Sequence, residues 1–240
     1  MTNSPAGKRN TRVYGRRIGR PLRKARQELI DSLLPQLRVV PASEGGPPLD
    51  LPSLFPGAES IWIEFGFGAG EHLAWQAAHH PAVGMLGCEV FQNGVASLLR
   101  HVREQGLANV RIAETDSFRV LGSLPETSIG RAFLLFPDPW PKARHHRRRF
   151  VRGEVLDLLA RALADGAEFR FATDHADYCA WVLARLLAHP AFAWAAEHPA
   201  DWRVRPADWP PTRYEERALA AGRSPVFLTF QRRPRRSGAT

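Results

Sequence analysis

The sequence predicts an α/β fold, a doubly wound and mostly parallel sheet with helices on both faces. From residue 61 onward, short apolar runs of strand length alternate with segments of helical period, which is typical of parallel βαβ units. A glycine-rich turn at 66–70 directly follows the first such strand, as it does in nucleoside-binding α/β sheets. The 240 residues, of which 44% are hydrophobic, suit one domain, and no apolar run is long enough to span a membrane.

Each expected element follows from a local pattern. We expect strands at 61–65, 83–90, 110–113, 129–136 and 168–173, with candidate terminal strands at 192–196 and 226–230. We expect helices at 27–37, 71–80, 92–105, 150–163 and 175–187, and proline-rich loops at 41–56 and 198–213. The clearest helix is 92–105, where Val95, Leu98, Leu99 and Val102 recur on one face before Gly106.

The charge is concentrated at the termini and in one internal run. The net charge of +9 and a sequence pI near 10.6 indicate a polyanionic partner. Residues 1–26 hold nine basic residues and no acid, which predicts a disordered RNA-contacting arm before a single domain at 27–234 and a flexible tail at 235–240. Cys88 and Cys179 form no C-x-x-C pair, which favours reduced thiols in the cytoplasm.

The segment 133–149, FLLFPDPWPKARHHRRR, combines several chemical features. Its apolar start predicts a buried strand, and the alternating prolines that follow predict a stiff backbone with extended residues before each proline. Asp138 therefore lies at the carboxyl end of a strand, where open α/β sheets bind ligands, and Trp140 could stack on a base. A basic patch follows, made of Lys142, Arg144, Arg147, Arg148 and Arg149. Taken alone, the segment also fits a rigid turn followed by a solvated helix start.

Three further acids lie at the ends of three successive strands and indicate the ligand of the glycine turn, whose glycines are Gly66, Gly68 and Gly70. A dinucleotide site favours a glycine at position 71, but this sequence has Glu71, and Glu64 precedes the turn. Two carboxylates disfavour a pyrophosphate and suit the sulfonium and ammonium groups of S-adenosylmethionine. We expect Glu64 near those cations, Glu89 on both ribose hydroxyls, and Asp116 on the adenine amino group.

The chain resembles the bacterial tRNA (guanine-N7)-methyltransferases. The resemblance covers about 61–230 and rests on the segments IEFGFGAGEHL, GCEV, ETDSF, FLLFPDPWPKARHHRRR, FATDHADY and PTRYEER. It implies a class I, Rossmann-like fold with a seven-stranded sheet, S-adenosylmethionine as cofactor, and methylation of guanosine 46 in the tRNA variable loop.

The resemblance also implies roles for individual residues. Cofactor contacts fall on Glu64, Glu89, Asp116 and Asp138, and the RNA-contacting run falls on Arg144, Arg147, Arg148 and Arg149. Substrate contacts fall on Lys142, Asp174, Thr212, Arg213, Tyr214 and Glu215, where Arg213-Tyr214 varies the family's Thr-x-Phe-Glu pattern.

Asp138 is the expected catalytic residue. The N7 atom of guanine carries a lone pair and no proton, so no strong base is needed, and orientation together with stabilisation of the developing ring charge should dominate. Asp138 stabilises that charge or recognises the guanine N1 and N2 hydrogens. Asp174 faces the base, caps the helix that starts near His175, or does both.

Three alternatives remain open at the level of sequence. Asp138-Pro139-Trp140 resembles the clamp of an amino-methyltransferase for adenine or cytosine, the charge fits a non-catalytic RNA-binding protein, and the glycine turn fits a dehydrogenase. Metalloprotease, P-loop and hydrolase motifs do not occur. We expect tRNA as partner, no metal, no membrane contact, and a monomer or weak homodimer.

Overall fold

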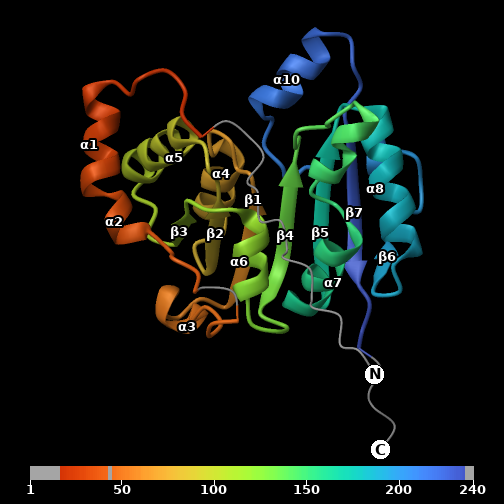
Figure 1. Ribbon diagram of the computed structural model, residues 1–240, viewed down its shortest axis with the longest axis horizontal. Coiled ribbons are helices and arrows are strands. Elements are labelled where there is room, and N and C mark those ends of the chain that lie inside the picture. Colours follow the sequence, from red (N-terminus) through yellow and green to blue (C-terminus); the bar gives the residue numbers. More distant parts are fainter. Residues whose placement is uncertain (1–16, 43–44, 236–240) are drawn as a thin grey trace, which may run out of the picture.

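The computed structural model describes residues 17–42 and 45–235 and contains the predicted doubly wound sheet (Figure 1). Seven strands form one sheet in the order β3-β2-β1-β4-β5-β7-β6. Their bounds are β1 Ser60–Phe65, β2 Val83–Cys88, β3 Val110–Ala113, β4 Ile129–Leu135, β5 Leu163–Thr173, β6 Phe192–Trp194 and β7 Val226–Arg232. Strands β1 to β5 pair in parallel, whereas β7 runs antiparallel to both β5 and β6. The expectation of a seven-stranded, mostly parallel sheet is confirmed.

Helices cover both faces of the sheet. One face carries α4 (Glu71–His79) and α5 (Gln92–Gln105), with α1 (Lys24–Ser32) packed on α5 and α2 (Leu34–Leu37) beside β3. The other face carries α3 (Leu51–Leu54), α6 (Ser117–Ser123), α7 (Gly153–Ala162) and α8 (Ala176–Ala188). The short η1 (Ala143–Arg148) and α9 (Ala200–Arg203) lie in connections, and α10 (Arg213–Ala220) precedes β7.

The amphipathic pattern of 92–105 forms α5 as expected. Val95, Leu98, Leu99 and Val102 are all buried, and burying each such side chain stabilises the fold by about 1.5–3 kcal/mol. Gly106 ends the helix in the left-handed conformation at φ 63°, as the sequence predicts.

Two expected helices differ from the prediction, each for a local reason. The helix expected at 27–37 ends at Ser32 and restarts at Leu34, because Pro35 has no amide hydrogen and its ring disrupts a continuous helix. The helix expected from 150 begins at Gly153. There the amide of Phe150 donates to the Tyr178 hydroxyl at 3.1 Å and the carbonyl of Val151 accepts from the Trp181 indole at 2.7 Å, so these residues are held extended against α8.

A proline-rich segment covers β4, β5 and β7 on the α4 side, where a helix could have packed. We call residues 205–212 the strap. Its Trp209 is 3% exposed and packs edge-on against Phe133 and Phe227, with ring centroids 6.4 and 5.5 Å away. The loop expected here is therefore part of the core, and it leads directly into α10.

Both ends of the described chain are attached to the domain. The Arg17 carbonyl accepts from the amide of Gln92 at 3.0 Å, and the amide of Gly19 donates to Asn93 at 3.0 Å. Arg235 pairs with Asp165. Residues near each end of the described chain thus contact the domain predicted at 27–234, while 1–16 and 236–240 lie outside the described residues. No helix in the described part of the chain is long and apolar enough to cross a membrane.

Candidate active site

Five acids lie at the carboxyl ends of the five parallel strands. They are Glu64 in β1, Glu89 after β2, Asp116 after β3, Asp138 after β4 and Asp174 after β5. Parallel strands end at one edge of a sheet, and α10 lies over that edge (Figure 1). The sheet therefore brings together acids that are distributed over more than one hundred residues of sequence.

The glycine turn packs against the start of α5. Gly66, Gly68 and Gly70 all have positive φ, and Gly68 has φ 58°. A Cβ atom on Gly94 would lie 2.1 Å from the Gly68 carbonyl oxygen, so only glycine at position 94 allows this approach. The sequence reasoning missed Gly94, although a glycine in the first turn of an amphipathic helix is a usable signal.

Glu89 connects β2 to the glycine turn. Its carboxylate accepts from the backbone amides of Gly68 at 2.9 Å, Val90 at 2.7 Å and Phe91 at 2.9 Å. Burial nevertheless raises the pKa of Glu89 above its ordinary value. A carboxylate has about four acceptor positions, so the three amide bonds leave room for one more donor. Acceptance of both ribose hydroxyls would require an amide bond to be shared.

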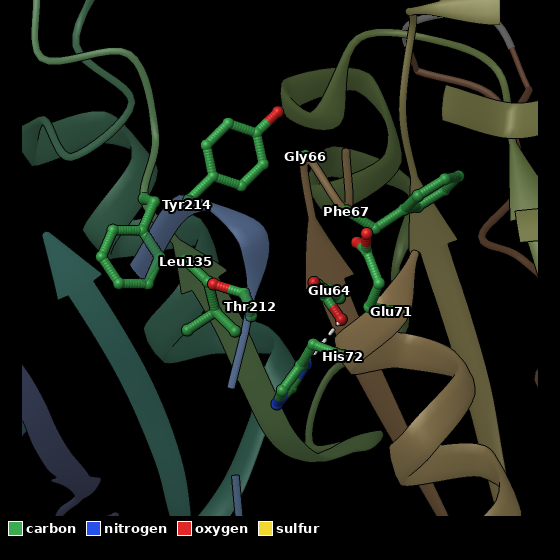
Figure 2. A pocket seen from close by; sticks show the side chains of 9 residues that line it. Glu64, Gly66, Phe67, Glu71, His72, Leu135, Thr212 and Tyr214 are labelled. Carbon is green, nitrogen blue, oxygen red and sulfur yellow. Dashed lines mark hydrogen bonds and ion pairs between the residues drawn. The ribbon is translucent and has the colours of Figure 1, made fainter. Parts of the chain in front are cut away.

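A shallow cavity, open to solvent on one side, lies beside the glycine turn (Figure 2). It is lined by Glu64, Gly66, Phe67, Glu71, His72, Leu135, Phe136, Thr212 and Tyr214. Glu64 is only 3% exposed, and its Oε2 atom lies 2.8 Å from Nδ1 of His72. Acidic and apolar groups therefore form its walls, as a cationic organic ligand requires.

Asp138 lies in a loop with unusual backbone geometry. Phe136 and Trp140 have φ values of 49° and 44°, so the expectation that residues before these prolines are extended is wrong at both positions. The amide of Phe136 still donates to the Ala172 carbonyl at 2.8 Å, which continues the sheet bonding past β4. Left-handed non-glycine residues cost on the order of 1–3 kcal/mol and cluster at functional sites. The side chain of Asp138 is exposed between them.

Arg149 corrects the predicted RNA-binding run. Its side chain is 0% exposed, its Nε donates to the Pro139 carbonyl at 2.9 Å, and it forms an ion pair with Asp177. The guanidinium also lies 5.0 Å from the Tyr178 ring and 4.9 Å from the Trp181 ring. The buried Arg149 is not available to phosphates and instead holds the loop that carries Asp138.

The other basic residues of the run reach solvent to different extents. Lys142, Arg144 and Arg147 are exposed, whereas Arg148 is half-buried and lies 4.8 Å from the Trp140 ring. Desolvation, together with the positive charges of Arg148 and Arg144, lowers the pKa of His145. The surface of η1 is therefore strongly positive and disfavours a further positive charge.

The segment 212–215 forms the start of α10 over the cavity. Thr212 caps the helix by accepting from the Glu215 amide at 3.2 Å. This contact is half of the Thr-x-x-Glu capping pattern. The pattern is a sequence signal for the start of α10, which the prediction of a loop at 198–213 did not use. Arg213 donates to Glu71 at 2.6 Å, which fastens α10 to α4. Burial, followed by the charge of Glu89, raises the pKa of Tyr214, whose ring covers Gly68.

Glu215 has an open acceptor position. The side chain is 11% exposed, and Oε1 accepts from Arg205 Nε at 3.1 Å. No protein donor reaches Oε2, which is buried, within the described part of the chain. Because buried carboxylate oxygens are rarely unpaired in a folded protein, this atom is suited to a donor on a ligand.

Asp116 and Asp174 differ in their secondary contacts. Asp116 caps α6 by accepting from the Phe118 amide at 3.1 Å. Asp174 accepts from Arg223 Nε at 2.6 Å. Of the two roles considered for Asp174, the helix cap is excluded, because α8 begins at Ala176 with His175 in the capping position. In the described residues no group of three or more potential ligands is arranged to hold a metal ion.

Comparisons with known proteins agree with this geometry. A family model described as "Putative methyltransferase" matches residues 58–228. Among solved structures, the 16S rRNA methyltransferase KamB covers 79% of this chain, with 96% of its own chain aligned, at a TM-score of 0.51 and 16% identity. An antibiotic-related methyltransferase covers 80%, with 94% of its own chain aligned, at a TM-score of 0.53 and 18% identity. At these identities the likeness establishes the methyltransferase fold alone.

Relatives of higher identity define the family more narrowly. The tRNA (guanine-N(7)-)-methyltransferase of Rhodospirillum rubrum is 52% identical over 228 residues, which are 94% of this chain and 89% of that protein. The protein of the same name from Paramagnetospirillum magneticum is 48% identical over 97% of this chain and 98% of its own length. The chain belongs to the tRNA (guanine-N(7)-)-methyltransferase family.

Proposed function

We propose that this protein methylates N7 of guanosine 46 in the variable loop of tRNA, with S-adenosylmethionine as methyl donor. The observation that carries the proposal is the cavity in which the acidic end of β1, at Glu64, faces Thr212 and Tyr214 of the α10 segment. Relatives with this activity in their names span nearly the whole chain. We further propose that the enzyme acts in the cytoplasm as a monomer or weak homodimer.

The residues at the glycine turn fit the cofactor. When bound, S-adenosylmethionine supplies an electrophilic methyl group on a positively charged sulfur. Glu64 offers a buried carboxylate to the cationic part of the molecule, and the close packing of Gly68 on Gly94 leaves backbone instead of side chains beside it. Glu89 has one acceptor position for a ribose hydroxyl, and Asp116 retains a carboxylate oxygen for the adenine amino group.

Acceptor groups on the α10 side fit the hydrogen-bonding edge of guanine. Guanine presents N1–H and N2–H donors, which a carboxylate can accept. Binding of these two donors leaves N7 free to react. Glu215 offers the unpaired Oε2 atom described above. Asp174, fixed in place by Arg223, is the second acid on this side of the edge, and Thr212 lines the cavity beside them.

Asp138 stabilises charge in this mechanism. Because N7 of guanine has no proton, the protein needs no base to activate it, and the reaction leaves the ring positively charged. A carboxylate that is held in advance near this charge lowers the barrier. Asp138 is held between two left-handed residues, and Arg149 fixes the following carbonyl of Pro139.

The exposed basic side chains supply the tRNA surface. Lys142, Arg144 and Arg147 lie next to the Asp138 loop, so phosphate contacts there would hold the variable loop near the cavity. The arm at 1–26 adds further positive charge. Arg149 contributes indirectly, through the loop.

Methyl transfer to unmodified tRNA tests the proposal. Purified protein with methyl-labelled S-adenosylmethionine should label a tRNA transcript that has guanosine at position 46 and leave a matched transcript with adenosine there unlabelled. Nucleoside analysis should recover the label in 7-methylguanosine. Equal labelling of the two transcripts would reject the position, and label in methyladenosine or methylcytidine would favour the amino-methyltransferase alternative.

A further inference from the structure

A chain of buried polar side chains runs beneath the cavity from Glu64 to the strap. His72 Nδ1 lies 2.8 Å from Glu64 Oε2, and His72 Nε2 lies 3.2 Å from the side-chain nitrogen of Gln76. That nitrogen also donates to the Asp208 carbonyl at 2.8 Å. Figure 2 shows His72 pointing at Glu64 from α4. All three side chains of the chain are buried.

The hydrogen bonds of this chain have only one consistent direction. A backbone carbonyl can only accept, so the oxygen of Asp208 requires the NH₂ group of Gln76 to face it. The second hydrogen of that NH₂ group is directed at His72, whose Nε2 must then be the acceptor. The imidazole hydrogen is therefore on Nδ1, from which it is donated to Glu64. The strap carbonyl, acting through Gln76, and the Glu64 carboxylate thus favour the same tautomer of His72.

Packing fixes the position of the imidazole ring. Phe133 and Trp209 meet the His72 ring edge-on at centroid distances of 4.7 and 6.1 Å. With the ring immobile and Nδ1–H directed at Oε2, the carboxylate of Glu64 has one orientation, and its other oxygen faces the cavity (Figure 2). Burying a carboxylate in one fixed orientation is costly unless such a donor is present.

Ion pairs hold the far end of the chain. The carboxylate of Asp208 pairs with Arg170 at 2.7 Å and Arg131 at 3.4 Å. Four residues later Thr212 lines the cavity and starts α10. Gln76 therefore joins the two walls of the cavity, the acidic wall at Glu64 and the wall that the strap supports.

We propose that His72 and Gln76 are positioning residues for methyl transfer. They orient the Glu64 carboxylate toward the cofactor and connect it to the strap, which leads into the segment 212–215 that we propose binds guanine. This inference rests on the proposed function, because it takes Glu64 to contact the cofactor. Neither residue touches the reacting atoms; both act through Glu64.

The first part of the test reads the tautomer directly. Nitrogen NMR of the imidazole in the wild-type protein should show hydrogen on Nδ1 of His72. In Gln76→Leu, which keeps the volume and removes the amide, Nε2 should lose its donor and its nitrogen resonance should move, while Nδ1 keeps the hydrogen that it donates to Glu64. Hydrogen on Nε2 of His72 in the wild-type protein would overturn the inference without any variant having to fold.

The second part reads function. His72→Phe, which removes the donor to Glu64, should raise the KM for S-adenosylmethionine about tenfold, in line with loss of a hydrogen bond to a charged group. Gln76→Leu should raise this KM by less, and both variants should leave the Kd for tRNA within twofold. His72→Gln, which restores a donor, should recover part of the loss. His79→Gln, on the exposed side of the same helix, is the matched control and should behave as wild type.

A third variant separates this inference from the proposed function. If Glu64→Gln binds S-adenosylmethionine as tightly as wild type, Glu64 does not contact the cofactor and that part of the proposed function fails with the inference. If Glu64→Gln loses affinity while Gln76→Leu and His72→Phe keep the wild-type KM, only the positioning role of His72 and Gln76 is rejected.

Discussion

Replacing Arg149 by methionine should unfold the protein at lower temperature and slow catalysis without weakening tRNA binding. The arginine lies inside a basic run, yet its guanidinium is buried between α8 and the loop that carries Asp138. Methionine keeps most of the stem, so packing volume changes little. The loss is confined to the hydrogen bond to Pro139, the pair with Asp177 and the contacts to two aromatic rings.

The size of the effect follows from these contacts. A hydrogen bond from a charged donor to a buried carbonyl contributes about 2 kcal/mol, and contacts between a guanidinium and an aromatic ring contribute about 1 kcal/mol. The Nη1 atom of Arg149 is buried without a partner in the described residues, which offsets part of this gain. A loss of about 2–3 kcal/mol in the free energy of unfolding corresponds to a decrease in Tm of roughly 4–12 °C for a chain of this size.

Calorimetry, single-turnover methyl transfer and tRNA binding at several salt concentrations test this prediction, with Arg147→Ala as control. Arg147 is exposed, so its removal should leave Tm unchanged and lower the slope of log affinity against log salt by about 0.7–0.9. Arg149→Met should show the reverse pattern: a lower Tm, a rate at least tenfold lower because the strained loop can relax, and an unchanged salt slope. If Arg149→Met kept its Tm and lost salt slope, the side chain would be an RNA contact after all.

Three further predictions concern charge at the same edge. Asp138→Asn should reduce the single-turnover rate roughly a hundredfold with tRNA affinity unchanged; a rate within a few-fold of wild type would leave Asp138 a structural residue. Burial raises the pKa of Glu89. As the pH is lowered, wild-type affinity for S-adenosylmethionine should therefore begin to fall above the pH range in which an ordinary glutamate is protonated. Isothermal titration of Glu89→Gln should show weaker binding without that pH dependence. The pKa of His145 is lowered by desolvation and by its basic neighbours, so NMR titration should find it raised when tRNA phosphates neutralise them; an unchanged value would move the RNA surface away from η1.

The sequence predicts the parts of this protein that depend on local patterns. The apolar stripe of 92–105 predicts both the helix and its buried face. The alternation of strand and helix predicts that each acid lies at the edge where the parallel strands end. Acids at the ends of successive parallel strands must share an edge, whatever the details of packing. Glu64 and Glu89 could therefore be placed before any coordinates were known.

The remaining features depend on contacts between distant segments. Arg149 is buried because Tyr178 and Trp181 of α8 enclose it, and nothing in a run of arginines distinguishes the one that such a helix will cover. The strap was expected to be an ordinary loop because its prolines disfavour regular structure. It is part of the core because Trp209 fills the face of β4, β5 and β7 that α4 and α5 leave open. The role of His72 likewise depends on a carbonyl in that strap.

Chemical cleavage of the methylated tRNA tests the central claim most directly. Borohydride reduction followed by aniline cuts RNA at 7-methylguanosine, so end-labelled tRNA incubated with the protein and S-adenosylmethionine should be cut once, at guanosine 46, and only when both protein and cofactor are present. Methyl incorporation without cleavage would show that an atom other than N7 accepts the methyl group. Cleavage at a different guanosine would show that the basic surface of η1 and the arm direct another part of the tRNA into the cavity.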